Sequence, residues 1–341
     1  MKREREVLDL NQGWTYLDRI DGDAAGLTAL AFYVQRYRHS DEGVWRERLE
    51  RGEIARDGRA LDPTEVLRAG DVLAWRRPPW EEPAVPTDFT ILYEDADLLA
   101  IDKPAGLPVL PDGGFLENTL VHLIGRRTVD DVPPTPVHRL GRGTSGIVLL
   151  ARTAAARRHL SEQFRQATHG DEGCLRKIYR TLTVAVSGLP DCVEITQPIG
   201  RVPHPRLNGV YAATPDGLAA RSLCRALERD SARILWEIDL ITGRPHQIRI
   251  HLASIGAPLL GDPLYGPGGT PRSLGAVDVA LPGDTGYTLH ACSLRFVHPR
   301  TEEPMELHAP IPVPLRTTAE CRRESPLTPM PSNVFKPRKS S

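Results

Sequence analysis

The chain has 341 residues, which is enough for two domains with separate cores. Lys and Arg (43) balance Asp and Glu (44), so the net charge of -1 does not point to a polyanionic partner, although a neutral chain can carry a basic face. No apolar run approaches a membrane span, and the first residues lack the apolar core of a signal peptide. Five widely spaced cysteines without a Cys-x-x-Cys pair favour a reducing compartment over a disulfide framework or a zinc site. We therefore expect a cytoplasmic protein without a metal or a membrane anchor.

The N-terminal block shows helix and hairpin patterns in close succession. In chain order they predict a helix, a second helix, a hairpin turning at an Asp-Gly pair, and a strand: residues 27–37, 44–49, 52–61 and 67–75. Ser40 or Asp41 suits the N-cap of the second helix. This order resembles the small S4-type RNA-binding module. Arg46 and Arg48 would then lie on an RNA-facing side of the helix pair, but a solvated helix surface explains them equally well.

A proline-rich segment at residues 77–86 separates this block from the rest of the chain and is typical of a stiff linker. The last 25 residues contain Pro, Ser and charged residues without periodicity, which predicts disorder. We expect four parts, an S4-like module, a linker, a larger domain and a disordered tail: residues 1–80, 81–86, 87–316 and 317–341.

Beyond the linker, short strand patterns outnumber helix patterns. The predicted strands are Thr90–Glu94, Asp97–Asp102, Ile147–Ala151, Arg180–Val186, Leu223–Glu228, Ile234–Ile241 and Gly286–Phe296. The predicted helices are Asn118–Gly125, Thr153–Thr168 and Gln247–Ile255. Strands and helices do not alternate regularly. The pattern therefore predicts an α+β fold with a mixed or antiparallel sheet, and not a doubly wound parallel one.

A glycine-rich string at residues 141–146 (Gly-Arg-Gly-Thr-Ser-Gly) fits G-x-G-x-x-G. A dinucleotide site needs a strand before the glycines and a helix after them, but here a proline-rich segment precedes and a strand pattern follows. A kinase phosphate loop needs a strand lysine shortly downstream, and residues 149–176 contain only arginines as strong bases. We therefore expect no nucleotide cofactor.

With its left flank the string becomes His-Arg-Leu-Gly-Arg-Gly-Thr-Ser-Gly at residues 138–146, which resembles the H-R-L-D-x-x-T-S-G signature of the RluA-type pseudouridine synthases. Further segments resemble that family in the correct order: residues 95–109, 176–179, 242–252, 256–266 and 289–291. The resemblance covers roughly residues 28–312, and an S4-type module in front is common in the family. It implies an isomerase that detaches uracil from ribose, rotates it and rejoins it through carbon. It also implies a structured RNA substrate, rRNA or tRNA, and no cofactor or metal. We further expect a monomer with no obligatory protein partner.

The resemblance also implies roles for individual residues. Arg142 would fill the gap left by the flipped base, Tyr179 would lie against the uracil, and Arg249 would reach the floor of the site. Taken singly, Tyr179 suits a half-buried strand position and Arg249 a helix position beside a carboxylate.

Residues 139–180 contain nine basic and three acidic residues, which suits a phosphate-contacting face but also a solvated one. We predict RNA contacts for four of the bases: Arg139, Arg157, Arg158 and Lys177.

Gly141 stands where the family carries its catalytic aspartate, and glycine can act neither as nucleophile nor as base. The sequence therefore predicts that Arg249 lacks the carboxylate it would pair with. Two hypotheses follow. The chain is an active synthase that draws a carboxylate from Asp130, Asp131 or Asp262, or it is a catalytically silent RNA-binding relative that keeps the uridine pocket.

Overall fold

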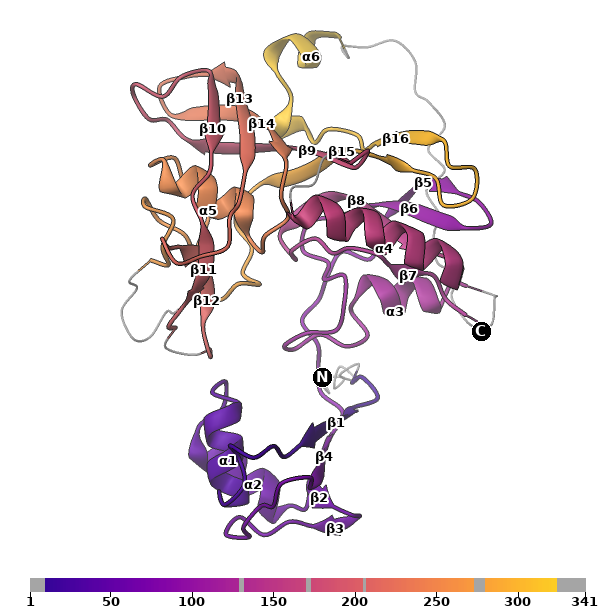
Figure 1. Ribbon diagram of the computed structural model, residues 1–341, viewed down its shortest axis with the longest axis vertical. Coiled ribbons are helices and arrows are strands. Elements are labelled where there is room, and N and C mark those ends of the chain that lie inside the picture. Colours follow the sequence, from indigo (N-terminus) through magenta and orange to yellow (C-terminus); the bar gives the residue numbers. More distant parts are fainter. Residues whose placement is uncertain (1–9, 129–131, 170–172, 205–206, 273–279, 324–341) are drawn as a thin grey trace, which may run out of the picture. The chain divides into compact units, whose positions relative to one another are not determined.

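The computed structural model describes residues 10–128, 132–169, 173–204, 207–272 and 280–323. The chain forms two compact units that divide between Pro83 and Ala84, and the first unit also takes in Pro203–Val210 (Figure 1). Among the described residues, no helix is long and apolar enough to cross a membrane.

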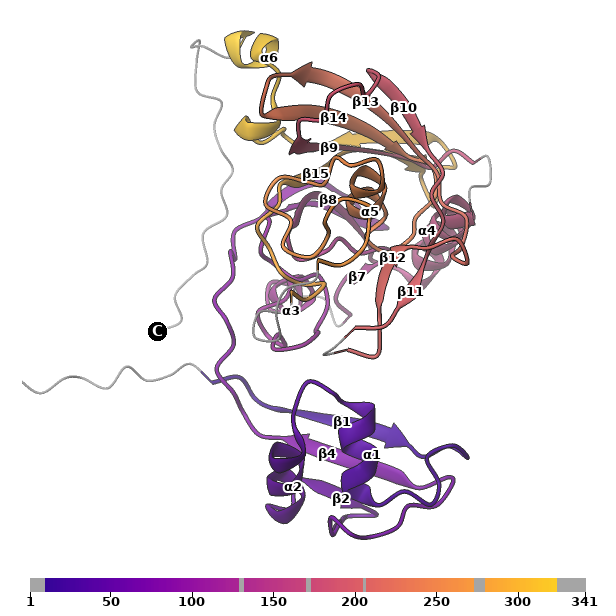
Figure 2. The same cartoon turned by 90° about the vertical axis from the view of Figure 1, so that its left-hand side faces the viewer.

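The first unit combines an antiparallel sheet in the order β1-β4-β2-β3 with two helices (Figure 2). The strands are β1 (Trp14–Arg19), β2 (Ile54–Arg56), β3 (Arg59–Ala60) and β4 (Val72–Arg77), and the helices are α1 (Ala29–Arg36) and α2 (Glu42–Glu50). Asp41 is the N-cap of α2, because its carboxylate accepts the Val44 amide at 2.9 Å. Both helices bury aromatic side chains against the sheet, and Tyr33, Trp45 and Trp75 share one core. The sequence patterns missed β1.

The second unit is built on a sheet in the order β10-β13-β14-β9-β15-β8-β6-β5, with β16 beside β15 and β7 beside β8. Its strands in chain order are β5 (Thr90–Glu94), β6 (Leu98–Lys103), β7 (Thr135–Pro136), β8 (Thr144–Ala151), β9 (Arg176–Val184), β10 (Cys192–Ile195), β13 (Ser222–Arg229), β14 (Arg233–Leu240), β15 (Leu289–Val297) and β16 (Pro304–His308). A separate pair is formed by β11 (Ile199–Val202) and β12 (Val210–Ala213). All pairings within the large sheet are antiparallel except β8 with β15. The predicted α+β fold with a mixed sheet is confirmed.

The parallel pair β8–β15 depends on a glycine. Gly146 has φ +107°, and a Cβ there would lie 2.3 Å from the Ala291 carbonyl oxygen, so only glycine allows the two strands to approach this closely. Because the strands run in the same direction, with Leu289 opposite Thr144, the segments that lead into them meet at one end. Those segments are residues 141–143 and 281–288.

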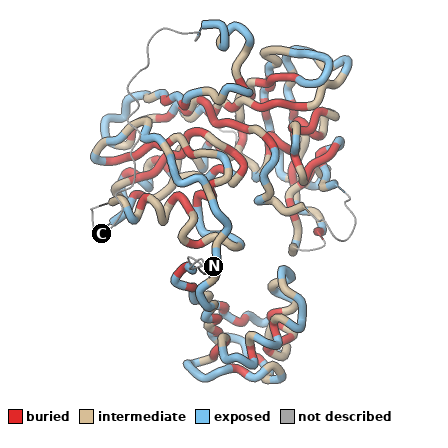
Figure 3. Tube along the Cα trace, turned by 180° about the vertical axis from the view of Figure 1, so that it is seen from behind, coloured by how far each residue is buried: buried red, intermediate tan, exposed pale blue. Residues whose placement is uncertain are grey.

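Helices cover parts of the second unit's sheet. They are α3 (Leu120–Gly125), α4 (Ala154–His169), α5 (Gln247–Ser254), a 3₁₀ turn η1 (Val313–Leu315) and α6 (Thr318–Arg323). Leu160 of α4 packs in one core with Ile147 and Leu149 of β8. Helix α5 is buried from Gln247 to Ala253. Figure 3 shows the burial along the central strands.

The prediction that disorder begins at residue 317 is wrong. Residues 318–323 form α6, which the carboxylate of Glu320 attaches to Arg180 of β9 at 2.8 and 3.0 Å. The sequence pattern missed this helix because its main partner is 140 residues away. The remainder of the predicted tail, residues 324–341, lies outside the described residues. The patterns also missed β7, β10, β11, β12 and β16, all of five residues or fewer.

Candidate active site

A turn at residues 141–144 carries the position of the missing aspartate. The Thr144 amide donates to the Gly141 carbonyl at 3.0 Å, and β8 begins at Thr144. Gly141 is exposed, and its backbone lies outside the left-handed region that favours glycine. A side chain would therefore not strain the backbone at this position, so the reason for glycine must lie in the surroundings.

Lys103 and Gly106 hold this turn from the end of β6. The buried Lys103 ammonium donates to the carbonyl oxygens of Pro104 and Leu107, each at 2.8 Å, and reaches that of Arg142 at 3.4 Å. The Gly106 amide donates to the same Arg142 carbonyl at 2.7 Å. Burial lowers the pKa of Lys103 to about 7. The Lys-Pro-Ala-Gly motif thus fixes the turn through backbone carbonyls.

Arg249 of α5 forms a buried ion pair with Asp262. The Arg249 Nε and Nη2 atoms donate to the two Asp262 carboxylate oxygens, each at 2.7 Å, and the side chains are 3% and 0% exposed. Burial alone would lower the pKa of Arg249, but the hydrogen bonds to Asp262 outweigh it and raise that pKa. The prediction that Arg249 lacks a carboxylate partner is wrong, because the Gly-Asp-Pro-Leu-Tyr segment supplies one.

The same contacts restrict what Asp262 can do. Its Oδ1 atom also accepts the backbone amides of Leu264 at 2.9 Å and Tyr265 at 3.0 Å. With both oxygens engaged and the side chain sealed from solvent, Asp262 is placed to hold Arg249 and the following loop. Of the other candidate carboxylates, Asp130 and Asp131 lie outside the described residues.

Tyr287, which the sequence did not single out, links Gly141 to Arg249. The Arg249 guanidinium carbon lies 4.3 Å from the centre of the Tyr287 ring and 4.9 Å from that of Tyr265. A Cβ built on Gly141 would lie 3.4 Å from the Tyr287 hydroxyl oxygen, and one built on Gly143 would lie 2.9 Å from its ring carbon Cζ. The Tyr287 side chain therefore occupies the space beside both glycines. The only sequence signal was Gly141 at the aspartate position of the motif, with a second glycine, Gly143, close by.

Tyr179 and Arg142 lie close to this group. Tyr179 stands opposite Ala291 in the β9–β15 pairing, is 8% exposed, and belongs to the same buried cluster as Tyr287. Burial raises the pKa of Tyr179. The Arg142 Nε atom donates to the Gly283 carbonyl at 2.8 Å, on the segment that leads to Tyr287.

The basic run at residues 139–180 separates into three kinds of side chain. Arg139, Arg157 and Arg158 are exposed, and no salt bridge joins them to an acid in the described part of the chain. Lys177 is buried, and burial lowers its pKa to about 8, so Lys177 does not lie on an exposed face. Four further arginines form ion pairs within the protein: Arg152, Arg165, Arg176 and Arg180.

The two arginines singled out in the N-terminal unit have partners there. Arg46 pairs with Glu42 at 2.7 Å, and both side chains are exposed. The Arg48 guanidinium lies over the rings of Trp45 and Trp75, at 4.4 and 4.8 Å from their centres. Arg48 is therefore partly committed to packing as a cation on aromatic rings.

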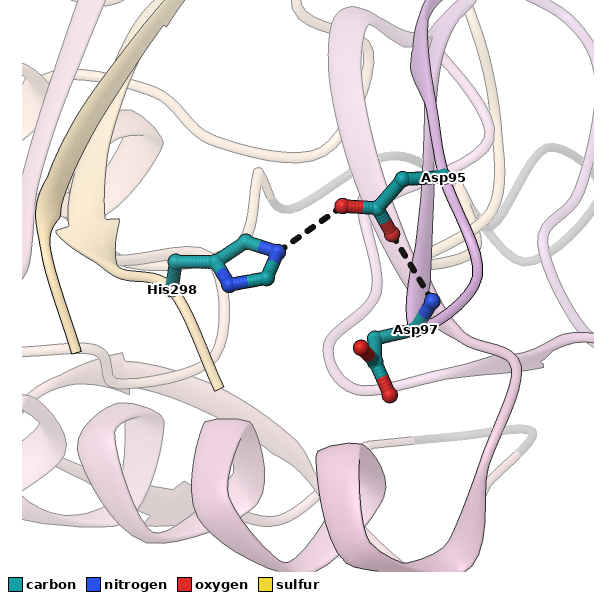
Figure 4. Close-up of side chains that lie close together, drawn as sticks. All are labelled: Asp95, Asp97 and His298. Carbon is teal, nitrogen blue, oxygen red and sulfur yellow. Dashed lines mark hydrogen bonds and ion pairs between the residues drawn. The ribbon is translucent and has the colours of Figure 1, made fainter. Parts of the chain in front are cut away.

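Asp95, Asp97 and His298 bring three possible metal ligands together (Figure 4). His298 Nδ1 accepts the amides of Arg300 and Thr301, so its Nε2 carries the proton and donates to Asp95 at 2.8 Å. Asp97 is paired with Arg300. These ligand atoms are engaged by hydrogen bonds within the protein, so the cluster serves to connect the β5–β6 turn to the end of β15.

Comparison with known proteins gives the same family as the motif. The family model for RNA pseudouridylate synthase matches residues 97–254. An uncharacterized RNA pseudouridine synthase of Synechocystis is 48% identical, over 84% of this chain and 95% of its own length. This chain belongs to the RluA-type RNA pseudouridine synthases. RNA pseudouridine synthase 5 of Arabidopsis thaliana is 38% identical over 92% of this chain and 96% of its own.

Two further relatives extend the comparison. Ribosomal large subunit pseudouridine synthase D of Xanthomonas campestris is 34% identical over 89% of this chain and 92% of its own length. The solved structure of human RNA pseudouridylate synthase domain containing 1 superimposes with a TM-score of 0.53 at 21% identity, covering 74% of this chain and all of that one. At that identity the likeness concerns the fold.

Proposed function

We propose that this family member is an active RNA pseudouridine synthase, converting uridine to pseudouridine in structured RNA. The observation that carries the proposal is the Arg249 guanidinium, which packs on the Tyr287 ring beside the motif turn. Arg249 is held there by a buried bidentate ion pair, which is costly to bury and is destabilising if half of it is lost. A site of this kind can stabilise charge that develops on a sugar or a base during reaction.

The substrate proposal rests on the surroundings of the turn. A uridine inside folded RNA must leave its stack before its glycosidic bond can be reached. Arg142 at the turn would fill the vacated place, and Tyr179 would lie against the flipped uracil. The exposed Arg139, Arg157 and Arg158 would contact phosphates. We propose rRNA or tRNA as the substrate, and ribosomal RNA is supported by the name of the Xanthomonas relative.

The N-terminal unit would act as an S4-like RNA-binding module. Its two helices and small sheet suit that assignment, and Arg36 and Arg38 add positive charge at the end of α1. All five cysteines are free thiols, which supports a reducing, cytoplasmic compartment. We propose that the enzyme works as a monomer without a cofactor.

The alternative is a catalytically silent RNA-binding relative. Gly141 supplies no carboxylate, and the Asp262 carboxylate is already engaged by Arg249 and two backbone amides. These observations favour silence unless another group near Gly141 acts on the ribose.

Mapping pseudouridines in cellular RNA with and without the gene would decide between the two. For an active synthase, one site disappears on deletion and returns with the wild-type gene, and purified protein converts the same uridine in vitro. An unchanged pseudouridine map, with RNA that is bound but not converted, would contradict the proposal.

A further inference from the structure

We propose that the Tyr287 hydroxyl is the group that acts on the ribose where relatives use an aspartate; this inference rests on the proposed synthase activity. The phenol would attack C1′ of the flipped uridine as a nucleophile. Gly141 and Gly143 would lack side chains because the tyrosine ring needs their space.

The position of the hydroxyl fits this role. It lies 3.4 Å from the Cβ that an aspartate at residue 141 would have. Carboxylate oxygens lie about 2.4 Å from their own Cβ, as ordinary bond lengths require. The Tyr287 hydroxyl thus sits next to the volume that an aspartate carboxylate would sweep, and it reaches that volume from the segment that leads into β15.

The two glycines are explained by the same side chain. At Gly143 a Cβ would approach the Tyr287 atoms Cζ, Cε1 and Oη to 2.9, 3.1 and 3.1 Å, which is too close for a real side chain. Neither glycine has a positive φ. Glycine at both positions therefore leaves space for the Tyr287 ring.

The Tyr287 hydroxyl is also available for contact with a substrate. Tyr287 is 6% exposed, and its hydroxyl makes no hydrogen bond to another described residue but is not fully buried, so it stays accessible. An accessible hydroxyl that no other described residue engages is available to a substrate atom, as donor or as acceptor. Tyr287 lies two residues before β15, its side chain belongs to a buried cluster, and the Arg249 guanidinium packs on its ring.

The chemistry balances without a cofactor. As the Tyr287 oxygen bonds to C1′, the C1′–N1 bond breaks with its electron pair passing to uracil, and the phenolic proton ends on N1. After the uracil rotates, C5 bonds to C1′, the C1′–oxygen bond breaks back to tyrosine, and the C5 proton restores the phenol. A tyrosine nucleophile at an anomeric carbon has precedent in sialidases. The Arg249 cation would stabilise negative charge developing on the phenolic oxygen.

The decisive experiment compares wild type with Tyr287→Phe on an RNA that the wild type converts. The phenylalanine keeps the ring, so folding and RNA affinity should stay near wild type while conversion falls roughly 100-fold or more. Tyr93→Phe, which removes a hydroxyl on β5, is the matched control and should convert at the wild-type rate. Wild-type protein incubated with 5-fluorouridine RNA should yield a tryptic peptide carrying the nucleotide on Tyr287.

A rescue variant separates a chemical role from a packing role. Adding Gly141→Asp to Tyr287→Phe restores the carboxylate of the family motif and should recover conversion. Gly143→Ala, whose methyl would displace the ring, should lower conversion with Tyr287 still present.

The two proposals fail differently. If the wild type converts no uridine, the proposed function fails. If the wild type converts and Tyr287→Phe converts equally well, the tyrosine inference is overturned while the synthase activity stands.

Discussion

At the scale of single residues, Lys103 shows how a motif residue can shape the site without touching the substrate. Its ammonium binds three backbone carbonyls, one of them the Arg142 carbonyl of the motif turn. The side chain is fully buried, so water cannot replace these contacts. Lys103 is therefore a positioning residue, and its removal would leave buried carbonyl groups without donors.

Lys103→Met should destabilise the protein by about 2–3 kcal/mol near neutral pH, because the carbonyls lose their donor. Burial lowers the folded-state pKa to about 7 from 10.5, so between these values the unfolded chain binds more protons than the folded one. The wild type should thus gain stability relative to the variant as the pH rises from about 7 toward 10. Urea unfolding at pH 7 and pH 9 measures the difference.

Arg126→Met, at an exposed position of α3's C-cap, is the control and should change stability by less than about 0.5 kcal/mol at both pH values. A Lys103→Met penalty that shrinks with rising pH would show that the folded protein favours the charged ammonium instead.

At the scale of secondary-structure elements, the Asp95 cluster connects the β5–β6 turn to the end of β15. Burial alone would raise the Asp95 pKa, but hydrogen bonds from the amides of Asp97 and Leu98, from His298 and from Tyr93 outweigh it and lower that pKa to about 2. The charged carboxylate is thus the form that the fold stabilises.

Asp95→Asn should cost about 2 kcal/mol of stability near pH 7, since the charge-assisted hydrogen bonds are weakened. The contribution of Asp95 is complete above about pH 4 and is lost as the pH falls toward 2, so the two proteins should converge in acid. Unfolding measured at pH 6 and pH 3 checks this, with exposed Asp88→Asn as a control that changes little. An Asp95→Asn stability loss that is the same at pH 6 and pH 3 would mean that packing, and not the carboxylate charge, stabilises the β5–β6 turn.

Helix α4 presents Arg157 and Arg158 side by side to solvent. Replacing both with Ala should weaken RNA binding across sequences. The slope of log affinity against log salt concentration should also become shallower, by the amount expected for about two lost phosphate contacts, because each contact releases a counterion. Affinity measured from 50 to 200 mM salt gives the slope. The control replaces Arg165 and Arg176, which are paired with acids; an equal loss there would contradict a specific role for the α4 pair.

At the scale of the whole molecule, the two units have separate cores. The first core joins residues between Ile20 and Trp75, and the cores of the second unit begin at Leu98. Each unit can therefore bury its own apolar surface, as independent folding requires.

Removing residues 1–83 should leave a second unit that unfolds cooperatively and binds RNA more weakly than the full chain. Circular dichroism during heating tests the fold, and an affinity measurement at fixed salt tests the module. Aggregation of the truncated protein would show that the boundary lies elsewhere, and unchanged affinity would contradict an RNA-binding role for the first unit.

The sequence by itself determined the family, the α+β class and most of the longer elements, because ordered motifs and hydrophobic periodicity are local properties. It also located the motif around Gly141 and the helix that carries Arg249. It missed β1, whose partner β4 lies far along the chain, and the strands β10, β11, β12 and β16, which are too short to show periodicity. It missed α6, whose partner Arg180 lies far along the chain.

Only the tertiary structure decided which side chains meet. Asp262 pairs with Arg249 across a loop, Lys177 lies buried, and Tyr287 fills the space beside Gly141 and Gly143. A glycine in a sequence shows that a side chain is missing, but it does not show what occupies the space. Here the parallel pairing of β8 with β15 brings Tyr287 to that space from more than 140 residues away.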